Sequence, residues 1–173
     1  YIDCSQVKTK LKLVRKIAAE FGVDAKGKYS DVYEDLTYYL RSIENPLIIL
    51  DEAGDLQYEA FLELKALWNA TERSCAWYMM GADGLKEKIN RSIECKKVGY
   101  TEMLSRYGDR YSKVTPDDGK EREAFLNAQA RTVAKVNAPA GADIAQIVRK
   151  TRGGLRRVYT CLLYTSPSPR DRG

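Results

Sequence analysis

A run of four apolar residues at positions 47–50, Leu-Ile-Ile-Leu, is the feature that most constrains how this chain folds. Asn45 and Pro46 come just before it and end the preceding helix, because proline disfavours the helical conformation in the residue before it. A short branched apolar run beside a turn signal is typical of a buried strand. Asp51 and Glu52 follow at once. The sequence therefore predicts a buried strand with two adjacent carboxylates at its carboxyl end.

Apolar strands alternate with amphipathic helices over the first half of the chain. The spacing of apolar residues predicts strands at 1–4, 47–50 and 75–80, and helices at 6–21, around Val32, Leu36, Leu40 and Ile43, around Phe61, Leu64 and Trp68, and at 84–95. Such alternation predicts an α/β fold, with a parallel sheet covered on both faces by helices. Ligands of such sheets bind at the carboxyl ends of the strands, where Asp51 and Glu52 are expected.

The second half of the chain is more helical. A short helix to Arg106 and a strand-like stretch at 110–114 are expected to complete the α/β part. Helices are then predicted at about 119–137 and 141–151, after a helix-start signal at 115–118. These patterns divide the chain into an α/β domain at 1–115 and a helical subdomain at 116–161.

Both ends of the sequence are unusual. The chain opens without Met in a strand-like stretch, which indicates that an N-terminal part of the domain is missing. From position 162 the composition changes, and prolines at 167 and 169 stop any helix. The segment 161–171 resembles translated sequencing-adapter read-through, and a native flexible tail is the alternative. Under either interpretation residues 162–173 contribute nothing to function.

Composition excludes several classes of function. The 173 residues contain no histidine, which excludes Ser-His and Cys-His catalysis and histidine zinc sites. The four cysteines form no C-x-x-C pair and are expected to be small buried residues. A net charge of +5 permits contact with nucleic acid without requiring it. No apolar run approaches the roughly 20 residues of a membrane span, so we expect a cytoplasmic protein with no membrane partner.

The adjacent acids have a specific chemical use. In nucleotide hydrolases, an Asp after a buried strand holds the Mg²⁺ beside the phosphates, and a neighbouring Glu accepts a proton from the attacking water. Side chains of neighbouring residues diverge, so Asp51 can serve the metal while Glu52 serves the water. In the alternative interpretation, both acids remain solvated and stabilise the positive N-terminus of the next helix.

The residues around this pair resemble those of the AAA+ ATPases, over about residues 1–160. Asp51-Glu52 matches the Walker B motif, and the segments 53–56, 63–69 and 78–85 are similar to the group that contains the phage Mu B transposition protein and transposon-encoded target-selection ATPases. The resemblance implies a P-loop AAA+ type parallel sheet flanked by helices, with a small C-terminal helical lid. It also implies ATP and Mg²⁺ as cofactors, with Asp51 at the metal, Glu52 as the catalytic carboxylate and Asp83 as sensor 1.

The same resemblance gives roles to two arginines. The segment 105–108, Ser-Arg-Tyr-Gly, is similar to the box that supplies an arginine finger in trans, which implies this role for Arg106, with Arg110 as the rival. A planar guanidinium suits phosphoryl charge better than an ammonium does. The segment 153–157 resembles sensor 2, which implies that Arg156 contacts the phosphates. The alternatives are surface pairing for Arg106 and a basic lid face for Arg156.

A complete phosphate-binding loop, G-x-x-x-x-G-K-[ST], does not occur in the sequence. Residues 22–28 have the glycines and the lysine at the right spacing, but Tyr29 replaces the Ser or Thr, and the segment follows a helix instead of a strand. We interpret it as a helix-ending glycine and a loop. The family's Walker A loop is expected upstream of Tyr1, so this fragment should hydrolyse ATP poorly or not at all.

The resemblance and the charge of the chain both predict binding partners. The resemblance implies an ATP-dependent oligomer or filament on double-stranded DNA, with a transposase or integrase as a further partner. Five basic residues on and after the helix at 84–95 are candidates for phosphate contacts: Lys86, Lys88, Arg91, Lys96 and Lys97. A solvated helix face is the alternative for them. Two other functions remain open, a DEAD-box-like helicase and a degenerate AAA+ scaffold or nucleotide sensor without turnover.

Overall fold

The structure is a computed structural model that describes residues 1–108 and 111–165. It divides into two compact units, Tyr1–Tyr111 and Ser112–Gly173, and each is described by itself. This division lies four residues before the boundary that the sequence predicts at 115. Within the described residues, no helix is both long and apolar enough to cross a membrane.

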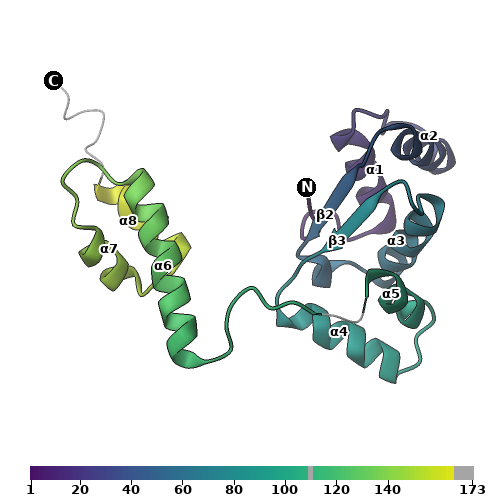
Figure 1. Ribbon diagram of the computed structural model, residues 1–173. Helices are drawn as coiled ribbons and strands as arrows, with labels where there is room; N and C mark the ends of the chain where they lie inside the picture. The colour runs from purple at the N-terminus through teal and green to yellow at the C-terminus, as the bar shows by residue number, and fades with distance from the viewer. Residues whose placement is uncertain (109–110, 166–173) are drawn as a thin grey trace. The chain divides into compact units, whose positions relative to one another are not determined.

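The first unit is an α/β structure built on a three-stranded parallel sheet in the order β1-β2-β3 (Figure 1). Its elements are β1 (Ile2–Asp3), α1 (Lys10–Glu20), α2 (Tyr29–Ser42), β2 (Leu47–Asp51), the 3₁₀ turn η1 (Ala53–Asp55), α3 (Tyr58–Ala70), β3 (Ala76–Met79), α4 (Asp83–Glu94) and α5 (Tyr100–Tyr107). The predicted alternation of strands and helices is confirmed. Each strand pairs in parallel because the intervening helices carry the chain back to the start of the next strand.

One face of this sheet is well buried and the other is partly open. Ile48 and Leu50 point to the same face and are 2 % and 0 % exposed, in one core with side chains of α1 and α3. On the opposite face Tyr78 is 51 % exposed. Right-handed crossovers between neighbouring strands taken in sequence place their helices on one side. The prediction that helices cover both faces is therefore wrong for the described residues.

The core of the first unit comes from the apolar faces that helical spacing predicts. Val32, Leu36 and Leu40 of α2 are buried, as are Phe61 and Leu64 of α3. The ring of Phe61 packs against that of Tyr100 in α5, with 5.5 Å between centroids. This contact joins α5 to the helix that follows the acidic pair.

The strand predicted at 110–114 is wrong for residues 111–114, and Arg110 lies outside the described residues. Residues 111–114 have no strand conformation, and Val114 is 75 % exposed. A strand is stable only when a neighbouring strand satisfies its backbone groups, and local alternation of side chains does not reveal whether such a neighbour exists.

The second unit contains α6 (Gly119–Asn137), α7 (Ile144–Thr151) and α8 (Leu155–Thr165). As the helix-start signal predicts, Asp118 caps α6 by accepting the backbone N–H groups of Lys120 and Glu121, both at 3.0 Å. The three helices share a small apolar core of Ala130, Ala134, Ile147, Val148, Val158 and Leu162. Helix α8 continues past position 162, where the sequence predicts the start of a tail, and residues 166–173 lie outside the described part.

The cysteines differ sharply in their surroundings. Cys4 is 0 % exposed, whereas Cys95 is exposed, so the expectation that all four are buried is wrong for Cys95. Burial, with smaller contributions from the charges of Asp3, Asp51 and Asp55, raises the pKa of the Cys4 thiol to about 12.

We expect a thiol reagent at about pH 8 to label Cys95 quickly and Cys4 only as the protein unfolds, since the thiolate is the reactive form. Mass spectrometry of labelled peptides measures the order of reaction. Equal labelling rates at Cys4 and Cys95 in native protein would contradict the burial of Cys4.

The pKa of Cys4 also has a consequence for stability. Folded Cys4 keeps its proton above the ordinary thiol pKa of 9.0, so the free energy of unfolding should fall as pH rises from 9.0 toward about 12.

Candidate functional site

Strand β2 carries Asp51 to the carboxyl edge of the sheet, as predicted. Asp51 is the last residue of the strand and lies opposite Asp3 of β1 in the parallel register. Its backbone carbonyl accepts the N–H of Cys4 at 2.9 Å. The two acids Asp3 and Asp51 therefore leave neighbouring strands at the same edge.

The carboxylate of Asp51 is held by two hydrogen bonds. Oδ1 accepts the backbone N–H of Glu52 at 2.9 Å, and Oδ2 accepts the hydroxyl of Tyr1. The hydrogen bond to Asp51, together with desolvation and the negative charges of Asp51, Asp3 and Glu52, raises the pKa of Tyr1 to about 12. The three acids Asp3, Asp51 and Glu52 give this edge a negative charge, which favours a cation there.

Glu52 lies outside the strand, in a left-handed backbone conformation with φ 50° and ψ 38°. This conformation is costly for a residue with a side chain. Its carbonyl accepts the N–H of Asp55 at 2.9 Å and so closes the turn η1, while its side chain is exposed. Glu52 therefore stands just beyond the strand that Asp51 ends, at the start of the turn.

A magnesium ion fits this edge as a partner of phosphate. The described residues contain no cluster of three or more acidic or thiol side chains that could hold a metal by themselves. Mg²⁺ keeps several waters and is commonly bound by one or two carboxylates together with substrate phosphates. Asp51, with its two oxygens at the sheet edge, suits that pattern and not an all-protein cage.

The exit of β3 lies beside the turn that follows β2. Met80 donates its backbone N–H to the carbonyl of Leu50 at 2.8 Å, and its own carbonyl accepts the N–H of Ala53 at 3.0 Å. A Cβ added to Gly81 would stand 3.1 Å from the side chain of Leu85, so the start of α4 packs tightly here. Asp83 begins α4 and is exposed, where its charge also stabilises the helix N-terminus.

Arg106 is engaged within the first unit. Its Nε donates to the side-chain oxygen of Asn69 at 2.7 Å, Nη1 donates to the carbonyl of Glu102 at 2.9 Å, and the guanidinium lies 5.5 Å from the Trp68 ring centroid. These contacts connect α5 to α3. The rival arginine, Arg110, lies outside the described residues.

The five basic residues predicted to contact DNA differ in their exposure to solvent. Lys86, Arg91, Lys96 and Lys97 are exposed, whereas Lys88 is half-buried and hydrogen-bonded to the backbone of the first unit. Its ammonium is thus already engaged by the protein itself, and its role as a DNA contact stays a prediction. Lys88 shares a helical face with buried Leu85 and Ser92, three and four residues away, and this spacing is the sequence signal that distinguishes it from Lys86.

Arg156 belongs to the second unit, where it is exposed in the first turn of α8. Gly153, just before this helix, has φ +71°, and a Cβ there would stand 3.0 Å from Oδ1 of Asn127. The glycine is therefore required for α8 to pack on α6. That requirement explains Gly153 without reference to a ligand.

The loop at 22–28 lies between α1 and α2, as the sequence interpretation has it. Gly22 has φ +73°, and α2 begins directly afterwards at Tyr29. A phosphate-binding loop connects a strand to a helix. This segment therefore lacks the required context.

Comparison with known proteins identifies the first unit. Neither the curated proteins nor the solved structures include a match to this chain. A family model described as an AAA domain matches residues 1–89, which is just over half of the 173 residues and includes Asp51, Glu52 and Asp83. Together with the parallel sheet and the acidic pair at its carboxyl edge, this match shows that the chain belongs to the AAA domain family of nucleotide-binding ATPases.

Proposed function

We propose that this chain is part of an ATP hydrolase in which Asp51 and Glu52 act on Mg²⁺-bound ATP. The observation that carries the proposal is the placement of the pair directly at the end of β2, in a member of the AAA domain family. Asp51 holds the metal ion, which when bound neutralises charge on the phosphate oxygens. Glu52, whose side chain is exposed, accepts the proton of the attacking water.

We further propose that the ATPase assembles with copies of itself on double-stranded DNA and regulates transposition or integration, with a transposase or integrase as partner. The motif similarity to the Mu B group and the exposed basic residues Lys86, Arg91, Lys96 and Lys97 support this proposal. Phosphate contacts from such residues give sequence-independent, salt-sensitive binding. In the same proposal Asp83 acts as sensor 1 and Arg156, in a helical lid, as sensor 2.

The test is Mg²⁺-dependent ATP hydrolysis by the protein translated from its complete reading frame, with and without double-stranded DNA. Turnover that DNA stimulates, and that weakens as salt rises from about 50 to 200 mM, is the expected result. Turnover indifferent to DNA would remove the transposition proposal and leave the ATPase. Nucleotide binding without turnover would favour a scaffold or sensor, an alternative consistent with the absence of a complete G-x-x-x-x-G-K-[ST] motif from these residues.

We propose that Arg106 acts as the arginine finger, and Arg106→Ala is expected to lower hydrolysis at least tenfold while ATP affinity changes little. Because Arg106 also bonds Asn69, the matched control is Asn69→Ala, which removes that hydrogen bond and keeps the guanidinium. Steady-state turnover and equilibrium nucleotide binding are compared for both variants. An equal loss of turnover in the two would show that Arg106 acts only by joining α5 to α3.

A further inference from the structure

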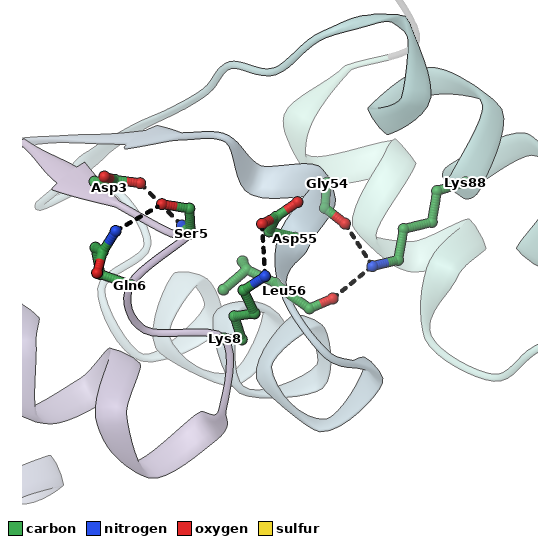
Figure 2. A network of polar contacts seen from close by, with 8 residues as sticks. All are labelled: Asp3, Ser5, Gln6, Lys8, Gly54, Asp55, Leu56 and Lys88. Carbon is green, nitrogen blue, oxygen red and sulfur yellow. Dashed lines mark hydrogen bonds and ion pairs between the residues drawn. The ribbon is translucent and has the colours of Figure 1, made fainter.

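Lys88 is a cation that faces the protein instead of solvent. It reaches from α4 to the turn after β2, where Nζ donates to the carbonyl of Gly54 at 2.7 Å and to that of Leu56 at 2.5 Å (Figure 2). The ammonium also lies 5.1 Å from the centroid of the Phe61 ring. A lysine that served only solubility or DNA contact would keep its head group in water.

The surroundings of Lys88 show that its placement has a cost. Burial lowers the pKa of its ammonium, and the nearby charge of Lys97 acts in the same direction, while Asp55 opposes the shift. The two carbonyl acceptors and the aromatic ring compensate in part for the water that the ammonium loses. The side chain is therefore retained in this position by contacts with the turn.

The turn that Lys88 contacts contains Glu52. The carbonyl of Glu52 accepts the N–H of Asp55, and that of Ala53 accepts the N–H of Leu56 at 3.2 Å. On its other side the turn is fixed by an ion pair of 2.8 Å between Lys8 and Asp55 (Figure 2). Lys8 and Lys88 thus hold the turn from two separate segments of the chain.

We propose that Lys88 is a positioning residue that clamps the turn at 52–56 and thereby keeps Glu52 in its left-handed conformation. A left-handed glutamate is unfavourable by itself, so neighbouring contacts must maintain it. Two hydrogen bonds from one ammonium, to the carbonyls of Gly54 and Leu56, hold the middle of η1 and the residue that follows it. The clamp stands on geometry alone, and its consequence for catalysis rests on the proposed function of Glu52.

The clamp is tested by hydrogen exchange at the amides of Asp55 and Leu56, which close the turn. Lys88→Met keeps the length of the side chain and removes its donors, and we expect these two amides to exchange about tenfold faster. The amide of Met80, bonded to Leu50 in the sheet, should keep its rate. Lys88→Arg, which retains donors for both carbonyls, should restore most of the protection.

Lys86→Met is the matched control, because Lys86 lies on the same helix and is exposed. It should leave all three amides unchanged. Unchanged exchange at Asp55 and Leu56 in Lys88→Met would overturn the clamp. If Met80 also exchanges faster, the comparison moves to Lys88→Gln, whose amide is shorter and uncharged and should protect the turn less than Lys88→Arg does. Equal protection of the turn in these two variants would likewise overturn the clamp.

A second arm measures catalysis in the protein from the complete reading frame. Lys88→Met should lower kcat for ATP about tenfold or more with little change in KM, since a displaced Glu52 affects the chemical step and not ground-state binding. Lys88→Arg should recover kcat. An unchanged kcat alongside faster exchange would overturn the link to Glu52, whereas no turnover in the unmodified protein would refute the proposed function and leave the exchange result standing.

Discussion

Replacing Glu52 by glutamine is expected to lower ATP turnover by about 10²–10⁴-fold while bound ATP is retained. The amide has nearly the shape of the carboxylate but accepts no proton from water, so the chemical step stops after binding. Glu52 is exposed and its side chain makes no contact needed for the fold, so the melting temperature should change little. Single-turnover hydrolysis and nucleotide release measure the two effects separately.

Glu59→Gln is the matched control for this substitution. Glu59 is also exposed, in the first turn of α3, and its replacement removes the same charge from the same unit. Turnover in Glu59→Gln should stay within about twofold of the unmodified protein, as for surface substitutions in general. If Glu52→Gln also retained full turnover, the acidic pair would have only a helix-capping or solvating role.

Phe61→Ala is expected to reduce the free energy of unfolding by about 3–5 kcal/mol. The ring is 1 % exposed, packs on Tyr100 and lies beneath the ammonium of Lys88, so its removal leaves a cavity among three helices. Urea unfolding followed by circular dichroism gives the change in midpoint. Because a loss of this size is a large fraction of the stability of a small domain, the midpoint should fall markedly.

Leu11→Ala is the control for cavity formation. Leu11 lies on α1 but is 42 % exposed, so its truncation should change stability by no more than about 0.5 kcal/mol. A loss at Phe61 below about 1 kcal/mol would mean that the core around α3 and α5 is loosely packed. The two substitutions together distinguish burial from hydrophobicity as the cause of any loss.

The sequence predicts the sheet and its acidic edge because both depend on local patterns. The apolar run at 47–50 and the two acids after it are adjacent in the chain, and the structure places them as β2 and the turn that follows. Helical faces on α2 and α3 are likewise set by spacing within one segment. Such features need no knowledge of distant residues.

Features that depend on residues far away in the chain are harder to predict from the sequence. Residues 111–114 have strand-like alternation but no strand conformation, and the alternation alone could not show this. Lys88 carries the same charge as its neighbours on α4, and the pattern of α4 alone does not reveal its hydrogen bonds to a turn more than 30 residues earlier. The exposure of Cys95 likewise depends on what packs near the end of α4.

Because Glu52 has a left-handed backbone conformation, selection for stability and selection for catalysis favour different residues at this position. For stability alone, glycine is the better residue at φ 50°, since glutamate there costs about 1–2 kcal/mol more. For the proton transfer that we propose, position 52 must carry a carboxylate. Lineages that give up hydrolysis but keep the fold should therefore drift toward glycine or asparagine at position 52, and stability screens of variant libraries should enrich the same residues.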